Sequence, residues 1–209
     1  MSTIPADESP TPNPHAPEGK YRRILDAALQ MFAAKGFHES KISEIARIAG
    51  VADGTIYLYF KNKDDLLISL FEYHLEAINR GLENALADAG DAADQLRTVI
   101  RYHLTVAAEN PSLAQLITIE LRRSQKFMRD YAKEQFTAYL AQFSRVIDHG
   151  KHTGRFRPDL STGMMRQTLF GALDTACVTW VANPNRKAED LEVFGGFLTD
   201  LMLRAVAPS

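Results

Sequence analysis

The sequence predicts an all-α protein in which three short helices with helix-turn-helix spacing are followed by a larger helical domain. Apolar residues recur three and four positions apart along most of the 209 residues, which is the period of amphipathic helices. Glycine and proline interrupt this pattern at intervals, and no segment alternates as a half-buried strand does. These interruptions divide the chain into nine predicted helices, at about residues 21–35, 42–49, 54–60, 64–88, 91–109, 111–123, 125–150, 161–182 and 188–205.

Composition and charge limit the classes to which the chain can belong. Its hydrophobic fraction of 45% is enough for a sizeable core. The single Cys177 allows no internal disulfide, and the sequence has neither a membrane-length apolar run nor a signal-peptide pattern, so we expect a cytoplasmic protein with no membrane partner. The net charge is −2, but residues 20–63 hold eight Lys or Arg against four Asp or Glu, a local +4 that leaves −6 elsewhere. The basic end is where a polyanion would bind.

The N-terminal segment and the first helix differ sharply in composition. Residues 1–19 hold five of the nine prolines and no Lys or Arg, which is typical of a disordered tail. The first helix, about Tyr21 to Lys35, has helically spaced apolar residues and stops at Gly36. Its apolar stripe consists of Ile24, Leu25, Ala28, Leu29 and Phe32. We expect this helix to pack across the two that follow.

The next two helices have the spacing of a helix-turn-helix. Ser40 is predicted to cap the first of them, and Gly50 to end it in a left-handed conformation. The second begins near Gly54, after a turn of three residues. This is the spacing by which a recognition helix is set in the major groove of DNA.

The segment TIYLYFKNK, from Thr55 to Lys63, carries the residues expected to bind. On a short helix Ile56 and Phe60 share one face, whereas Tyr57 and Tyr59 project elsewhere. Hydroxyl and ammonium groups, together with the free N–H groups of a helix N-terminus, are donors to phosphate oxygens. The sequence therefore predicts a core face and a face for a nucleic-acid backbone.

These residues resemble a known family. The stretch GVADGTIYLYFKNKDDLLISLF at residues 50–71, with YRRILDAALQMFAAKGF before it, resembles the DNA-binding domain of TetR-family bacterial regulators. Within that family these stretches of sequence are most similar to the FadR-type repressors of fatty-acid degradation. Weaker similarities to those repressors lie in IELRRSQ at residues 119–125 and FGALDTACVTWV at residues 170–181.

The resemblance implies a ligand-responsive transcriptional repressor that binds a pseudo-palindromic double-stranded DNA operator as a homodimer. It implies a DNA-binding domain at residues 20–63, an effector-binding and dimerisation domain at residues 64–209, and a long-chain fatty acyl-CoA as effector, with no cofactor. The implied DNA-binding residues are Ser43, Gly54, Thr55, Tyr57, Tyr59 and Lys63.

The effector site is expected between the long helix at residues 64–88 and the helices after it. That helix starts at the basic end and its apolar stripe can line a cavity, so it is the natural mechanical link between the domains. A basic cluster later in the chain shares a helical face beside apolar residues, as the phosphates and acyl tail of an acyl-CoA would require, although a solvated basic face is the simpler reading. The expected site residues are Phe71, Leu75, Leu116, Ile119, Arg122, Lys126, Arg129, Tyr139, Phe143, Phe170 and Asp174.

The last two helices predict a dimer interface. The helix at residues 161–182 is apolar nearly all round and so must be covered on several sides, in part by a second subunit. Two helices from each chain would form a four-helix interface, with Ala172, Ala176, Phe194, Phe197 and Leu201 at the contact. Asp174 in the same helix could meet an arginine, cap a dimer contact or face a ligand.

Two alternatives to an acyl-CoA-responsive repressor remain open at this point. One is a TetR-type repressor with the same DNA-binding domain and another hydrophobic effector, such as a drug or an aromatic compound. The other is an all-α enzyme, for which no catalytic constellation is recognisable in the sequence. His149 and His152 have helical spacing without an accompanying carboxylate or Cys, and Cys177 lies in an apolar helix, so we expect neither a metal site nor a nucleophile.

Overall fold

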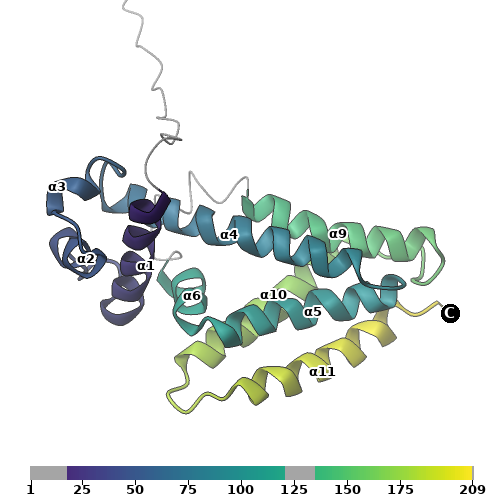
Figure 1. Ribbon diagram of the computed structural model, residues 1–209. Helices are drawn as coiled ribbons and strands as arrows, with labels where there is room; N and C mark the ends of the chain where they lie inside the picture. The colour runs from purple at the N-terminus through teal and green to yellow at the C-terminus, as the bar shows by residue number, and fades with distance from the viewer. Residues whose placement is uncertain (1–17, 121–134, 209) are drawn as a thin grey trace, which may run out of the picture.

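The computed structural model describes residues 18–120 and 135–208, and this part of the chain forms nine α-helices and one π-helix, with no strand. Figure 1 shows a small head, a long body, and one helix, α4, that begins at the head and runs along the body. The head consists of α1 (Glu18–Lys35), α2 (Ile42–Ala49) and α3 (Asp53–Ile56). The body consists of α4 (Lys63–Ala87), α5 (Ala92–Glu109), α6 (Pro111–Gln115), the π-helix η1 (Leu116–Glu120), α9 (Gln135–His152), α10 (Thr162–Ala182) and α11 (Ala188–Val206). The predicted all-α class is confirmed.

The head is built on the predicted apolar faces. Ile24, Leu25 and Phe32 of α1 are fully buried. Ile56 and Phe60 are each 1% exposed, so the predicted core face of the recognition segment is confirmed. The segment is less helical than expected, because α3 stops at Ile56 and the next three residues form a turn.

The turn between α2 and α3 forms as predicted, but the cap of α2 does not. Gly50 ends α2 with φ of 66°, a left-handed conformation that glycine adopts without strain. The N-cap of α2 is Lys41, not Ser40. Ser40 is buried, and its hydroxyl instead turns back to the carbonyl oxygens of Gly36 (2.7 Å) and Met31 (3.2 Å). The prediction of a Ser40 cap was wrong because α2 begins one residue later than a Ser40 cap requires, and the Ser40 side chain is directed to the end of α1.

The start of α4 is held by its own cap. The side chain of Asn62 accepts a hydrogen bond from the Asp65 backbone N–H (2.9 Å), while the Asp65 carboxylate accepts one from the backbone N–H of Lys61 (2.8 Å). The first bond satisfies an N–H group that the helix leaves free, and the second holds the residue before the cap. The two acidic residues of the first turn, Asp64 and Asp65, favour the same end. A well-fixed first turn lets α4 act as a rigid rod between head and body.

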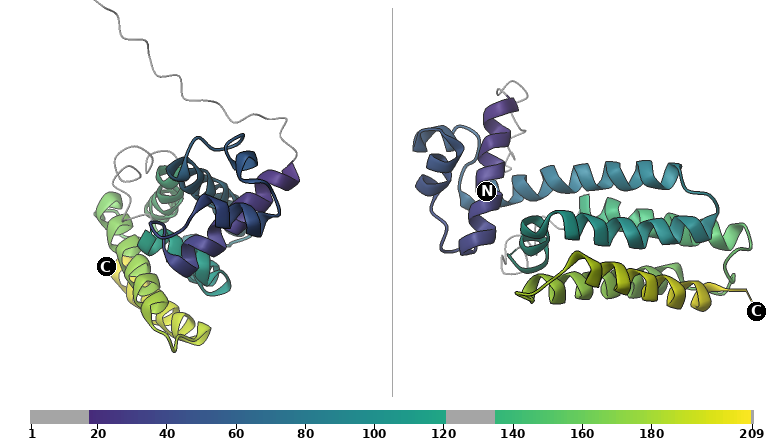
Figure 2. Two further views of the ribbon diagram at one scale, coloured as in Figure 1. Left: turned by 90° about the vertical axis from the view of Figure 1, so that its left-hand side faces the viewer. Right: turned by 60° about the horizontal axis from the view of Figure 1, so that its bottom comes forward.

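The body packs its helices in layers along α4. Figures 1 and 2 show α9 and α5 beside α4, and α10 and α11 forming the far side of the body. The α5–α11 contact is close: a Cβ on Gly195 would lie 3.0 Å from Cδ1 of Leu104. Ser161 caps α10 by accepting a hydrogen bond from the backbone N–H of Met164 (3.4 Å). The predicted bounds of the last two helices differ from the observed ones by one residue at most.

Other boundaries differ more. α1 begins at Glu18, so the last two residues assigned to the tail belong to a helix. The helix predicted at 111–123 is α-helical only to Gln115 and continues as the wider π-helix η1, within which the hydroxyl of Thr118 donates to the carbonyl of Ala114 (2.6 Å). Residues 1–17 and 121–134, including the predicted start of the helix at 125–150, lie outside the described residues.

Long apolar helices of the kind that cross membranes are not found in the described part of the chain.

Candidate functional site

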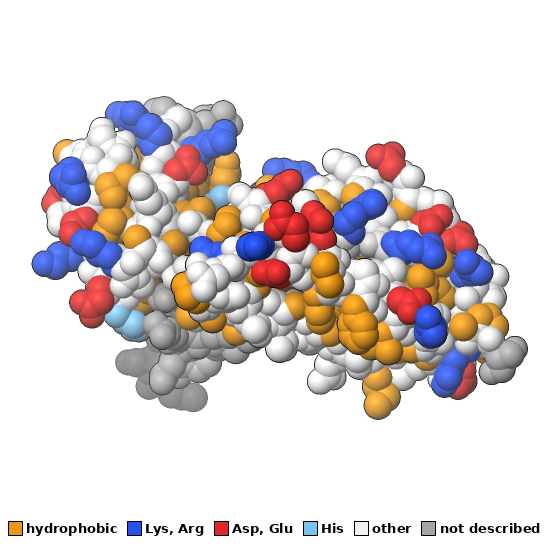
Figure 3. All heavy atoms as spheres, turned by 90° about the horizontal axis from the view of Figure 1, so that it is seen from below, with side chains coloured by type: hydrophobic (Ala, Val, Ile, Leu, Met, Phe, Trp, Pro, Cys, Tyr) orange, Lys and Arg blue, Asp and Glu red, His pale blue; other side chains and the backbone are white. Residues whose placement is uncertain are grey.

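The outer surface of the head carries most of the residues predicted to contact DNA. Ser43 on α2 and Gly54 on α3 are exposed, and Thr55 is half-buried. Tyr57, directly after α3, is 57% exposed. Lys and Arg side chains are spread over the surface of the head in the view of Figure 3. This surface therefore presents hydroxyl groups and backbone N–H groups in a basic environment, a combination suited to phosphate oxygens.

The other two predicted DNA contacts have partners inside the head. Tyr59 is half-buried, with its ring centroid 6.1 Å from that of Tyr21. The ammonium group of Lys63 donates to the backbone carbonyls of His38 (2.9 Å) and Ser40 (3.1 Å) and lies 4.7 Å from the centroid of the Phe37 ring. Lys63 therefore joins the start of α4 to the head, and Tyr59 packs against α1 within the head. The sequence pattern reveals neither role.

A cavity lies in the body between α4, α5, α6, η1, α9 and α10. Its lining surface is mostly apolar, and the cavity, which is partly open, has a volume of about 80 Å³. Sites for drug-sized ligands usually measure roughly 300–1,000 Å³, so the cavity is small beside them. The lining residues are Phe71, Leu75, Ile78, His103, Val106, Ala107, Leu113, Ala114, Ile117, Thr118, Phe136, Tyr139, Phe170, Asp174 and Cys177.

The cavity brings together part of the predicted effector site. Five of the predicted residues line it, namely Phe71, Leu75, Tyr139, Phe170 and Asp174. Leu116 and Phe143 are buried in the surrounding core, and Ile119 packs against that core, but none of the three lines the cavity. The predicted basic cluster of Arg122, Lys126 and Arg129 lies outside the described residues.

The cavity wall includes a hydrogen-bonded polar pair, His103 of α5 and Tyr139 of α9. Nδ1 of the imidazole is 2.7 Å from the phenol oxygen. Burial lowers the pKa of His103 to about 4, against the opposing effect of the Asp174 charge, and burial raises the pKa of Tyr139. Both groups are therefore neutral near pH 7. Burial also raises the pKa of the Cys177 thiol to about 12, which leaves it unreactive as a nucleophile.

His103 was not among the predicted site residues, although the sequence contains a signal for it. The buried residues Leu96, Val99, Ile100 and Ala107 of α5 are helically spaced, and His103 falls on the same face. A polar residue within an apolar stripe must face either a partner or a cavity. Here it faces both, since Tyr139 is its partner and the cavity lies beside it.

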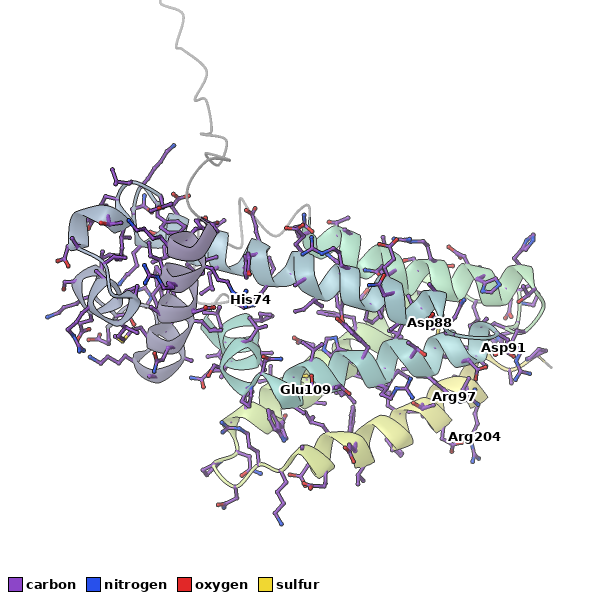
Figure 4. The ribbon with its side chains drawn as sticks, viewed as in Figure 1. His74, Asp88, Asp91, Arg97, Glu109 and Arg204 are labelled. Atoms are coloured by element: carbon purple, nitrogen blue, oxygen red, sulfur yellow. The ribbon has the colours of Figure 1, made fainter. Side chains whose placement is uncertain are left out.

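The short helix α6 connects the cavity with the head. Leu113 and Ala114 of α6 line the cavity. Gln115, the next residue, donates a hydrogen bond from its side-chain amide to the backbone carbonyl of Ala33 in α1 (2.9 Å). His74, labelled in Figure 4, lies on α4 where that helix passes α1. α4 and α6 therefore both line the cavity and contact α1. The π-helix that follows α6 is a further unusual feature, since π-turns often occur at functional sites.

One surface of the body is unusually apolar. Three side chains of α11 at four-residue spacing are exposed: Val193 (75%), Phe197 (63%) and Leu201 (49%). Met164 of α10 is 72% exposed. Hydrophobic side chains gather along the lower edge of the body in Figure 3, which views the molecule from the side on which α11 lies. The other predicted interface residues, Ala172, Ala176 and Phe194, are half-buried and pack against the core.

Within the described ranges no cluster of three or more His, Cys, Asp or Glu side chains is placed to hold a metal ion.

Two protein families together match most of the chain. Residues 24–70 match the family described as bacterial regulatory proteins of the tetR family. Residues 71–195 match the family described as the C-terminal region of YsiA-like proteins. The join between the two matches falls inside α4, whereas the predicted domain boundary lies at the start of that helix.

Individual relatives extend this similarity over nearly the whole length. The fatty acid metabolism regulator protein of Bacillus subtilis is 35% identical over 90% of this chain and 95% of its own. The solved structure of the fatty acid degradation regulator FadR from Bacillus halodurans has a TM-score of 0.84 at 35% identity, covering 91% of this chain and 97% of that one. FadR from Bacillus subtilis, solved in complex with stearoyl-CoA, has a TM-score of 0.83 at 35% identity and covers 89% and 99% of the two chains.

Proposed function

Because the chain belongs to the TetR family of bacterial regulatory proteins, we propose that it is a transcriptional repressor of fatty-acid degradation genes. A dimer binds a pseudo-palindromic operator, and a long-chain fatty acyl-CoA releases it. The observation that carries the effector assignment is the apolar cavity between α4 and α10, in a chain 35% identical to a regulator solved with stearoyl-CoA. The relatives are regulators, so the proposed activity is control of transcription in the cytoplasm and not catalysis.

DNA binding is assigned to the outer surface of the head. The exposure of Ser43, Gly54 and Tyr57 and the partial exposure of Thr55 support contacts from these four residues to phosphates and base edges in the major groove. The local charge of +4 on residues 20–63 supports the same surface, and binding that depends on phosphates should weaken steeply as salt is raised.

Tyr59 and Lys63 are still expected to contact DNA, but they contribute less to the affinity than the exposed residues do. Lys63 uses two of its three N–H donors on the carbonyls of His38 and Ser40, which leaves one for a phosphate. Its main contribution is then to hold the head in register with α4. The half-buried ring of Tyr59 packs against Tyr21 and supports the head in a similar way.

Dimerisation is assigned to the exposed faces of α10 and α11. A patch containing Val193, Phe197, Leu201 and Met164 is costly to leave in water, and a second copy offers the same patch through a two-fold axis. Ala172 and Ala176 are small enough to let helices approach closely. The two copies would then place their heads on successive major grooves, about 34 Å apart.

The switch is assigned to the joint movement of α4 and α6. An acyl chain needs more room than the 80 Å³ of this cavity, and in this proposal its entry pushes the lining helices apart. Phe71 and Leu75 lie on α4, which continues into the head, and Gln115 on α6 is bonded to Ala33 of α1. Displacing either helix would rotate the head, so that the two heads of the dimer would no longer fit successive major grooves. Sequence reasoning suggested only the α4 route.

The experiment that tests this proposal is release of fluorescently labelled operator, selected from random duplexes with the purified protein. Stearoyl-CoA should raise the concentration of protein needed for half-saturation at least tenfold, and octanoyl-CoA should do so much less, because each buried methylene contributes about 0.8 kcal/mol. Free stearate and free coenzyme A should each release the operator only weakly, since neither fills both the apolar cavity and a site for phosphates. If stearate alone is as effective as stearoyl-CoA, the phosphate site assigned to Arg122, Lys126 and Arg129 is wrong. If none of these compounds releases the operator, another hydrophobic effector, such as a drug, must replace the acyl-CoA.

A further inference from the structure

The His103–Tyr139 pair is the strongest candidate for a role not yet assigned. The two side chains come from different helices, α5 and α9, and both line the cavity. Their rings lie 5.9 Å apart, and the Phe170 ring stands edge-on to His103 at 6.1 Å. An alkyl chain alone needs only apolar walls. Polar side chains at such a wall are costly to bury unless each of their hydrogen-bonding groups has a partner.

Counting hydrogens shows what the pair can offer. A neutral imidazole has one N–H and one acceptor nitrogen, and a phenol has one O–H. One of these two hydrogens makes the 2.7 Å hydrogen bond between Nδ1 and the phenol oxygen. The other remains, on Nε2 if the phenol donates, or on the phenol oxygen if Nδ1 donates. Whichever arrangement holds, the pair retains one donor, and the part of the chain that the structure describes gives neither side chain a second hydrogen bond.

The other polar groups of the lining do not offer an equivalent donor. The Thr118 hydroxyl already donates to the Ala114 carbonyl at 2.6 Å. Cys177 carries only a weak S–H donor. Asp174 is a carboxylate whose charge acts on His103, and a carboxylate accepts hydrogen bonds. The pair is therefore the strongest hydrogen-bond donor among the described residues that line the cavity.

We propose that the His103–Tyr139 pair donates one hydrogen bond to the thioester carbonyl oxygen of the bound acyl-CoA, an assignment that rests on the proposed function. The acyl group of a saturated acyl-CoA is hydrocarbon except for this carbonyl, so it holds the only oxygen acceptor that such a chain brings to the cavity wall. The hydrogen bond fixes how far the chain enters. It also lets the protein distinguish a thioester from an alkane of equal length, because a buried donor left without an acceptor weakens binding.

The test compares stearoyl-CoA with the thioether in which a CH₂ group replaces the carbonyl, leaving chain length and coenzyme unchanged. Direct titration of the full-length protein should give an affinity for the thioester about 10- to 100-fold higher than that for the thioether. The double variant His103→Phe and Tyr139→Phe removes both donors, so its preference should fall to about 1. Tyr102→Phe is the matched control, since Tyr102 donates to the Ile78 carbonyl and is not part of the cavity lining, and it should keep the full preference.

Equal affinity of the unaltered protein for the two ligands would overturn the proposal even if the double variant does not fold. A double variant that folds and keeps the preference would overturn it as well. If both ligands bind equally tightly and release the operator, the proposed function stands and the hydrogen bond alone is rejected. If neither ligand binds, both the acyl-CoA assignment and the proposed hydrogen bond are rejected.

Discussion

Phe197→Glu should convert the protein from a dimer to a monomer and remove its affinity for the operator. The side chain of Phe197 is 63% exposed, so the substitution should leave the fold of one copy intact. In the dimer proposed here, each copy would bury a carboxylate among apolar side chains. An unpaired buried charge costs about 3–5 kcal/mol, and a dimer would contain two. The dissociation constant of the dimer should therefore increase at least a hundredfold.

Sedimentation velocity at micromolar protein measures this result directly. The matched control is Glu192→Lys on the flank of α11 that faces α5, away from Phe197. That variant changes the charge of the same helix by two units and should remain a dimer. A Phe197→Glu protein that sediments as a full dimer would show that the interface lies elsewhere, whatever its effect on DNA binding.

Tyr57→Ala should abolish operator binding while leaving the dimer unchanged. Tyr57 follows α3, is 57% exposed and lies outside the apolar core of the head. Its loss costs little in the free protein but would remove a phosphate contact from each half-site. A hydrogen bond to a charged group contributes about 1.5–3 kcal/mol, and two per dimer correspond to a loss of roughly a hundredfold to ten-thousandfold in affinity.

A gel-shift titration with the selected operator, together with sedimentation of the same samples, measures both halves of this prediction. Tyr57→Phe keeps the ring but lacks the hydroxyl that makes this hydrogen bond, so its affinity should fall by a similar factor. Unchanged affinity of the alanine variant would mean that the segment after α3 does not enter the groove.

Local signals predicted much of the fold. Gly50 ends α2 as predicted, and α10 begins within one residue of the predicted start, because helix ends depend on the conformational preferences of a few neighbouring residues. The burial of Ile56 and Phe60 followed from helical spacing in the same way. Where a side chain has a choice of partners, the sequence was a poorer guide. Ser40 bonds to the end of α1 instead of capping α2, and Lys63 bonds to carbonyls of the α1–α2 loop, 23 and 25 residues away.

The candidate effector site was only partly predictable for the same reason. Phe71, Leu75 and Phe170 line the cavity as their apolar stripes suggested. Leu116 and Phe143 lie on similar stripes, yet they fill the core beside the cavity, because periodicity predicts burial and not which buried residues border a cavity. The contact between Gln115 and Ala33 joins residues 82 positions apart and has no local signal at all.

In the proposed function, acyl-CoA and operator bind to competing states of one protein. Linkage requires each ligand to lower the affinity of the protein for the other by the same factor. The most direct measurement is the affinity for stearoyl-CoA of the free dimer and of the dimer saturated with operator, compared with the operator affinity with and without stearoyl-CoA. We predict that both affinities fall by the same factor, at least tenfold. An affinity for stearoyl-CoA that is identical in the free and the operator-bound dimer would contradict the account.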